Sequence, residues 1–212
     1  QANRQSGTGS ASTVSSHTSV AGTGLDLLGT GLEGDPGSIY LGESWPEGNL
    51  ILKGGKMVSN YRFRYDIYAD QMQFISEGDT LAFASPSELY SITFEDRTFV
   101  YEPFECNGML MKGYFELIVP GKKQLLLKRT ITYHLPDEEV TDVPQSKYLV
   151  SECYFLKIVG QPAQKLVCSK KQALDVMGDK KSELEEYMKK TGNKVKTPND
   201  LKKMVEYYNT LE

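Results

Sequence analysis

The stretch MVSNYRFRYDIYADQMQFISEGDTLAF, residues 57–83, decides the fold class. Aromatic and aliphatic residues occupy alternate positions along most of it, with Arg and Asp between them, which is the period of a strand with one buried face. Two-residue turns at Ala69-Asp70 and Glu77-Gly78 set apolar residues opposite apolar residues, as antiparallel hairpins require. The predicted pairs are Ile67–Met72, Tyr65–Phe74, Phe74–Leu81 and Met72–Phe83.

The same pairing rule holds on both sides of this stretch. A Gly54-Gly55 turn pairs Leu52 with Met57, and a Glu95-Asp96 turn pairs apolar with apolar residues again. Four independent turns that agree on one buried face predict an antiparallel β-meander. The pairs at the last turn are Ile92–Phe99 and Tyr90–Tyr101, and the strand before Ile67 should bury Phe63, Tyr65 and Ile67 while exposing Arg62 and Arg64 more.

Two long strands follow, over about 110–119 and 123–133. A two-residue turn between them would set Leu117 opposite Gln124, so a three-residue loop at 120–122 with a bulge is predicted, and it pairs Leu117 with Leu125 and Phe115 with Leu127. The acidic, proline-bounded stretch 136–144 should be an exposed loop. A last hairpin over 148–159 and 164–168 completes the β region, with Val159 opposite Gln164.

That last register places Cys153 and Cys168 on one face in a diagonal relation, about 7–8 Å apart. This separation is at or beyond the limit for an unstrained disulfide, so the two thiols should be near but unbridged. Cys106 is the third cysteine. The spacing forms no metal motif and allows at most one disulfide, so small buried thiols are expected.

After Cys168 the period becomes helical. Ser169 and Asp179 are expected to cap two short helices that end at Gly178 and Gly192. A third begins at Thr197-Pro198-Asn199-Asp200, which places a cap, a proline at the first helical position and an acid in the first turn. This helix carries Leu201, Met204, Val205 and Tyr208 on one face. Such short helices need a packing partner.

The predicted fold is therefore mainly β (α+β overall): an antiparallel meander, curled or sandwich-like, with a C-terminal cluster of short helices. Three segments are predicted: a flexible leader rich in Ser, Gly and Thr at 1–36, an antiparallel β domain at 37–168, and a helical appendage at 169–212 packed on the β domain. The leader should be dispensable for stability. Its leucines either dock on the body or serve as spacer, and they are Leu25, Leu27, Leu28 and Leu32.

Composition excludes several classes of protein. The net charge of −4 argues against a nucleic-acid binder, which would carry a basic face. The sequence contains no apolar run of about 18 residues, so no transmembrane segment is predicted. The sequence begins with Gln1 rather than Met, which is consistent with a removed signal peptide or with a chosen boundary.

The search for reactive groups predicts no catalytic, cofactor-binding or metal-binding residue. His134 is the one histidine outside the leader and stands where a strand meets a loop. Asp66 and Asp70 could hold a cation, but turn formation explains them more simply. Gly22-Thr23-Gly24 lacks the lysine and strand–helix context of a phosphate loop. The adjacent acidic pairs are typical of solvated surface rather than opposed carboxylates; they are Glu138/Glu139 and Glu185/Glu186.

Five short stretches are distinctive: GSIYL (37–41), WPEG (45–48), KGGK (53–56), RYDIYADQM (64–72) and YYNTL (207–211). Together they resemble a family of uncharacterised exported β-rich proteins of Gram-negative gut bacteria. The resemblance extends over about 37–211 and implies a periplasmic, outer-membrane-associated or extracellular location and a β-rich body with a helical end. It carries over no catalytic residue.

These observations favour a non-enzymatic cell-envelope or secreted β module that binds a protein, surface or glycan partner. The 13 tyrosines and eight phenylalanines suit either a binding surface or ordinary strand packing. The alternative is a periplasmic carrier that holds an apolar ligand in a half-barrel cavity. A hydrolase using His134 or a carboxylate pair is the third reading, and it needs a cleft in which these groups converge.

Overall fold

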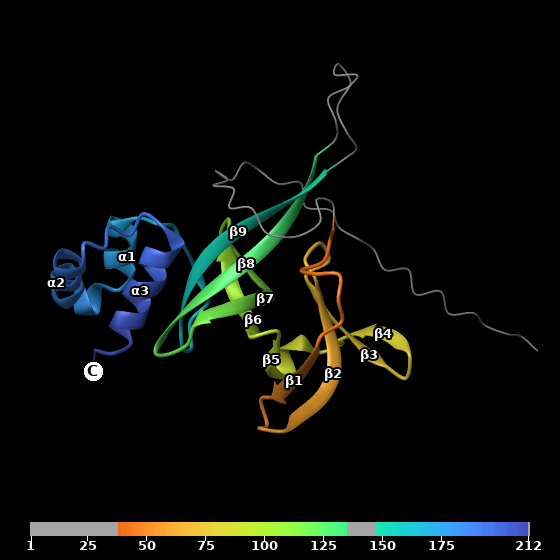
Figure 1. The fold of residues 1–212 in the computed structure, drawn as a ribbon. Coiled ribbons are helices and arrows are strands. Elements are labelled where there is room, and N and C mark those ends of the chain that lie inside the picture. Colours follow the sequence, from red (N-terminus) through yellow and green to blue (C-terminus); the bar gives the residue numbers. More distant parts are fainter. Residues whose placement is uncertain (1–37, 135–146, 212) are drawn as a thin grey trace, which may run out of the picture.

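The fold is that of a computed structural model, which describes residues 38–134 and 147–211. The predicted leader and the predicted acidic loop lie outside the described residues. Ten strands and three helices follow each other along the described chain (Figure 1). The strands are β1 (Glu47–Leu52), β2 (Met57–Asp66), β3 (Gln71–Ser76), β4 (Asp79–Ala82), β5 (Leu89–Phe94), β6 (Arg97–Cys106), β7 (Met109–Val119), β8 (Lys123–His134), β9 (Lys147–Ile158) and β10 (Gln164–Leu166). The helices are α1 (Lys170–Val176), α2 (Lys181–Thr191) and α3 (Pro198–Tyr208), with 3₁₀ turns at Pro86–Glu88 and Gly178–Lys180.

The strands form one antiparallel sheet in the order β10-β9-β8-β7-β6-β5-β1-β2-β3-β4. The order is that of a meander with one departure: β5 returns to the free side of β1, so that β1 lies between β5 and β2. The sheet is not closed. The predicted fold class, an antiparallel meander with a C-terminal cluster of short helices, is confirmed. No helix within the described ranges is long and apolar enough to cross a membrane.

Two of the predicted hairpin registers are confirmed. Phe74 pairs with Leu81 across the β3–β4 turn, and Ile92 pairs with Phe99 across the β5–β6 turn. Both central residues of each turn have positive φ: 52° and 91° at Glu77-Gly78, and 49° and 59° at Glu95-Asp96. Such two-residue turns match the twist of the paired strands.

The predicted register is wrong at the first two hairpins. Asp66 accepts a hydrogen bond from the Ala69 backbone N–H at 2.8 Å, which makes a longer turn and pairs Tyr65 with Met72 instead of Phe74. The buried face is unchanged because the shift is by two residues. Between β1 and β2, Ile51 rather than Leu52 pairs with Met57, and the predicted register returns only beyond a bulge at Asn60, where φ is +65°.

The last hairpins also differ from the prediction. The expected bulge between β7 and β8 is present, but Val119 rather than Leu117 pairs with Leu125. Between β9 and β10, Gln164 pairs with Leu156 rather than Val159. The physical reason is a hydrogen bond that ties the β9–β10 connection to β6. The Ala163 N–H donates to the Pro103 carbonyl at 2.7 Å, and this position of Ala163 shifts the register of β10.

The revised register separates the two cysteines that were predicted to be neighbours. Cys153 packs against a buried cluster that includes Phe104, Phe115 and Phe155, whereas Cys168 packs against the cluster that joins the helices to the sheet. A shift of three residues exchanges the faces of the strand, so the predicted diagonal relation is wrong. All three cysteines, Cys106 included, are free and half-buried.

The sheet is curled around a cluster of buried aromatic and aliphatic side chains, called the aromatic cluster below. Ile131 of β8 and Val150 of β9 pack against this cluster, although several strands separate β8 from β2 in the sheet. The rings of Tyr68 and Tyr148 also meet, with centroids 6.2 Å apart. The cluster consists of Leu50, Phe63, Tyr65, Ile67, Met72, Leu89, Ile92, Phe94, Phe99 and Tyr114.

The predicted burial pattern of β2 is confirmed. Phe63, Tyr65 and Ile67 are buried, Arg62 is exposed and Arg64 is half-buried. The guanidinium of Arg64 lies between the rings of Tyr40 and Trp45, 3.6 and 4.2 Å from their centroids. This stacking explains why Arg64 is less exposed than its neighbour.

The three helices pack together at one end of the sheet (Figure 1). The capping prediction is confirmed for α3, where Thr197 and Asp200 form a capping box, and Gly192 ends α2 in the left-handed region. Ser169 occupies the predicted N-cap position of α1, although its side chain makes no capping hydrogen bond, whereas the prediction is wrong for α2, whose N-cap is Lys180 rather than Asp179. The predicted apolar face of α3 is buried, and its residues are Leu201, Met204, Val205 and Tyr208.

Asp179 instead joins the helices to the sheet. Its carboxylate accepts hydrogen bonds from the Lys123 ammonium of β8 at 2.7 Å and from the Tyr208 hydroxyl of α3 at 2.6 Å. These two hydrogen bonds lower the pKa of Asp179, while burial and the nearby carboxylate raise the pKa of Tyr208 to about 12. The side chain of Asn209 adds hydrogen bonds to the backbone of Pro120 and Lys123.

The helix attachment should therefore weaken in acid. A carboxyl whose pKa is lowered on folding stabilises the fold above its ordinary pKa, 3.8, and this contribution is lost as the pH falls through the lower folded value. We expect the urea midpoint to fall more between pH 5 and pH 3 in the unaltered protein than in Asp179→Asn. Equal losses in the two proteins would contradict this role of Asp179.

Candidate ligand-binding pocket

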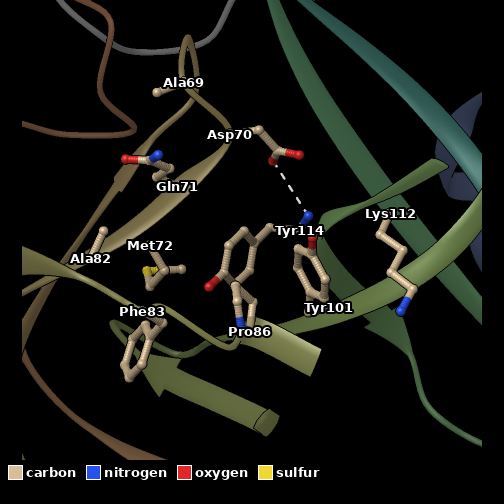
Figure 2. Close-up of a pocket in the computed structure, with 10 residues that line it drawn as sticks. All are labelled: Ala69, Asp70, Gln71, Met72, Ala82, Phe83, Pro86, Tyr101, Lys112 and Tyr114. Atoms are coloured by element: carbon tan, nitrogen blue, oxygen red, sulfur yellow. Dashed lines mark hydrogen bonds between the residues drawn. The ribbon is translucent and has the colours of Figure 1, made fainter. Parts of the chain in front are cut away.

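A pocket of about 280 Å³ lies where the β2–β3 turn approaches β6 and β7 (Figure 2). The turn, β6 and β7 supply part of its wall, and β3, β4 and the segment that follows β4 supply the rest. The lining residues combine polar and charged side chains with aromatic and aliphatic ones. They are Ala69, Asp70, Gln71, Met72, Ala82, Phe83, Pro86, Tyr101, Lys112 and Tyr114.

Asp70 is held at the pocket by three donors on one oxygen. Its Oδ1 accepts from the Tyr65 hydroxyl at 2.6 Å, from the Lys128 ammonium at 2.6 Å and from the Tyr114 backbone N–H at 3.3 Å. The last of these hydrogen bonds is drawn in Figure 2. Charged hydrogen bonds of this kind are short and directional, so they fix the orientation of the carboxylate.

Lys128 reaches Asp70 through an opening in the sheet. The pairing of β7 with β8 begins only at Glu116, so Tyr114 of β7 has no backbone partner on β8. The ammonium of Lys128 donates to the Tyr114 carbonyl at 3.1 Å instead. The ion pair thus takes over the backbone groups that the ladder leaves unpaired. The side chain of Lys128 is 8% exposed and that of Asp70 is 32% exposed. Burial lowers the pKa of Lys128, and the charge of Asp70 opposes this effect.

Gly113 makes room for the ion pair. A Cβ at this position would lie 2.4 Å from Asp70 Oδ2 and 2.7 Å from Lys128 Nζ. Both contacts are shorter than real Cβ atoms allow, so any other residue would push the two charged groups apart. The glycine is therefore part of the frame that positions Asp70.

Tyr114 is the most deeply buried polar residue of the pocket. The residue is 2% exposed, and its hydroxyl has no hydrogen-bond partner among the described residues. Figure 2 shows its ring extending toward Met72 and Phe83 in the pocket. Burial and the charge of Asp70 raise the pKa of Tyr114, and the Met72 backbone opposes this effect. Because the hydroxyl is itself buried, a ligand in the pocket does not reach it, and Tyr114 supports the wall of the pocket through its packing in the aromatic cluster.

Tyr101 forms the half-buried side of the same wall. Its ring meets the ring of Tyr114 edge to face, with centroids 4.9 Å apart. Burial and the charge of Asp70 raise the pKa of Tyr101. Both phenols are therefore neutral at physiological pH and can donate as well as accept hydrogen bonds.

The candidate residues named from the sequence do not meet in this pocket. Asp66 and Asp70 do not share a site: Asp66 closes its own turn, and Asp70 is paired with Lys128. His134 ends β8, but its side chain is outside the described set, as are Glu138 and Glu139. Glu185 and Glu186 lie on α2, away from the pocket. No group of His, Cys, Asp and Glu in the described chain could hold a metal ion.

The sequence contained only an indirect sign of this pocket. Its many tyrosines were compatible with a binding surface, but nothing singled out Tyr101, Tyr114 or Lys128. These residues come from strands that approach the β2–β3 turn only because the sheet is curled.

Searches of protein-family models, of curated proteins and of solved structures gave no match to this chain.

Proposed function

We propose that this protein is a non-enzymatic binding module of the cell envelope or a secreted one, and that the pocket beside Tyr101 and Tyr114 is where its partner is recognised. The observation that carries the proposal is the open pocket of about 280 Å³, where the half-buried ring of Tyr101 stands beside the charged groups of Asp70 and Lys112. A protein, a surface or a glycan could present the group that fills it. The location is proposed from the resemblance described above.

The rigid frame of the pocket supports a binding role. Asp70 is fixed by three donors, and Tyr114 is fixed by its packing in the aromatic cluster. A site whose polar groups are already oriented loses less conformational entropy when a ligand binds. Such a pocket is therefore suited to recognition without rearrangement.

The chemistry of the lining does not favour a reaction. Asp70 is the one carboxylate among the lining residues, and one of its oxygens is already engaged by three donors. Acid–base hydrolysis by carboxylates uses a pair of them on opposite sides of the bond. The phenols, with pKa values raised above their ordinary range, are poor bases at neutral pH.

The carrier alternative receives less support. The curled side of the sheet is filled by the aromatic cluster, in which Phe63 and Phe99 are at most 1% exposed. A pocket of about 280 Å³ is below the range of about 300–1,000 Å³ that is usual for drug-sized ligands. It suits one small group of a partner better than a whole apolar ligand.

The proposal is tested by retention on immobilised ligands. A panel of defined oligosaccharides, polysaccharides and synthetic peptides is probed with the purified protein and with Tyr101→Ala, which removes one wall of the pocket. We expect at least one ligand to be retained and its retention to fall about tenfold or more in the variant, since one interface aromatic is commonly worth 1–2 kcal/mol or more.

Tyr187→Ala is the matched control, because Tyr187 is a half-buried tyrosine of α2 that stacks on Tyr207, away from the pocket. It should leave retention unchanged, and the retained ligand should be recovered chemically intact. Retention that is equal in Tyr101→Ala, or absent on the whole panel, would refute the proposal, and conversion of the ligand would refute its non-enzymatic part.

A further inference from the structure

We infer that the part of the helical cluster where α2 connects to α3 is a docking surface for an anionic phospholipid bilayer. The inference concerns a different surface from the pocket, so it goes beyond the proposed function and does not depend on it. Three observations carry it: a local excess of positive charge, the lack of ion-pair partners for that charge, and its place at one end of an otherwise acidic molecule.

Residues 189–203 carry a strong excess of positive charge. This stretch covers the end of α2, the connection to α3 and the first turns of α3. It contains six lysines and one acid, Asp200, which gives a net charge of +5. All six lysines are exposed, and we call them the lysine patch. They are Lys189, Lys190, Lys194, Lys196, Lys202 and Lys203.

Hydrogen bonds hold the connection against α3, so the lysine patch is one continuous surface. The Asn193 side chain donates to the Asp200 carbonyl at 2.8 Å, and the backbone N–H groups of Lys196 and Thr197 donate to the Asp200 carboxylate at 3.0 and 3.3 Å. Val195 is buried among the helices, while the lysines on either side of it stay exposed. The single acid of the stretch is thus engaged in holding the connection.

The rest of the chain does little to compensate this charge. Among the described residues, only Lys202 of the lysine patch takes part in an ion pair, with Glu206 at 3.9 Å. Glu185 and Glu186 precede the patch by one turn of α2, at its edge. The helix dipole favours the two lysines in the last turn of α2 but not the other four. Repulsion among like charges disfavours such a concentration, and an anionic partner would relieve it.

The chemistry of the lysine patch suits a fluid anionic surface. All six of its cations are ammonium groups, and none is a guanidinium. An ammonium is a strongly hydrated point charge on a flexible stem, whereas the planar fork of arginine is preferred for phosphates in a fixed geometry, as in nucleic-acid recognition. Lipid headgroups move in the plane of the bilayer. Clusters of about four to eight basic residues on a helical surface are typical of binding to anionic lipids.

The distribution of charge over the molecule favours a planar partner over a long polyanion. The whole chain has a net charge of −4, so the residues outside 189–203 carry −9. The helices lie at one end of the sheet, with α2 on the side away from it (Figure 1). A plane can touch this end while most of the acidic remainder stays beyond the Debye length, which is about 8 Å at physiological salt. A nucleic acid that extended along the body would meet the acidic part.

The test is co-sedimentation of the whole chain with lipid vesicles. Vesicles of phosphatidylcholine and phosphatidylglycerol in equal parts are compared with vesicles of phosphatidylcholine alone, and a DNA duplex is tested in parallel. We expect binding to the anionic vesicles at low salt and its loss at high salt, because salt screens exposed charges. The double variant Lys194→Gln/Lys196→Gln should partition about tenfold or more weakly, since each lysine near an anionic bilayer contributes about fivefold.

Lys53→Gln/Lys56→Gln is the matched control, because it removes the same charge from exposed lysines of the β1–β2 turn, outside the lysine patch. It should leave partitioning nearly unchanged, and neither double variant should alter the melting temperature, since all four lysines are exposed. Equal binding to the two kinds of vesicle, or equal losses in the two double variants, would overturn the inference. Binding to the DNA duplex without binding to the vesicles would also overturn it. The proposed pocket stands or falls separately, on the retention assay with Tyr101→Ala.

Discussion

Phe63→Ala is expected to lower the free energy of unfolding by about 3–5 kcal/mol, the usual cost of truncating a buried phenylalanine. Phe63 is fully buried in the aromatic cluster, and its ring stacks on Phe94 with centroids 6.1 Å apart. It also lies under Gly48, where a Cβ would come 3.0 Å from its ring. The backbone of β1 is thus packed against the ring, so the cavity left by alanine cannot collapse easily.

Urea denaturation followed by fluorescence measures this change. Tyr90→Ala is the control, because Tyr90 is 61% exposed on β5 and its loss should alter the free energy of unfolding by no more than about 0.5 kcal/mol. A loss below about 1 kcal/mol in Phe63→Ala would show that the ring is not part of a packed core.

Lys128→Met should cost about 3 kcal/mol, because it leaves Asp70 without its cation. Removing one partner of a buried ion pair usually costs about 3–5 kcal/mol, since the other charge stays buried and unpaired. The lower end applies here because Asp70 keeps 32% of its side-chain surface exposed. The same substitution also removes the donor to the Tyr114 carbonyl.

A double-variant design isolates the ion pair. Lys128→Met combined with Asp70→Asn should recover part of the loss, because a neutral amide no longer needs the cation. Lys202→Met is the matched control: Lys202 and Glu206 form an exposed pair at 3.9 Å on α3, and such pairs are worth about 0.5 kcal/mol or less. Lys128→Met with no greater effect than Lys202→Met would contradict the role given to the pair.

Local patterns were sufficient to predict the fold class and much of the local structure. The alternation in β2 identified its buried face, and Glu77-Gly78 and Glu95-Asp96 identified two turns with their registers. The capping box at Thr197 likewise depends on residues a few positions apart. These features are set by interactions within a short stretch of chain, and a sequence displays such interactions directly.

The wrongly predicted registers depend on hydrogen bonds that the two-residue period of a strand does not reveal. Asp66 lengthens its turn by accepting from Ala69, and Ala163 is fixed by β6, some sixty residues earlier in the chain. This period indicates which face of the sheet a residue occupies, but it does not indicate which residue of the next strand lies opposite. The predicted face was therefore correct at the β2–β3 hairpin, where the register differs from the prediction by two residues. It was wrong at β10, where the register differs by three.

The pocket was decided only by the tertiary structure. The sequence by itself determined a meander with one buried face and a capped helical end. The return of β5 to β1 and the curl of the sheet then carried the β2–β3 turn to β7 and β8, so that Asp70 met Lys128 beside Gly113 and Tyr114. Packing among distant strands sets this curl, and no short segment records it, which is why the candidate binding residues could not be named in advance.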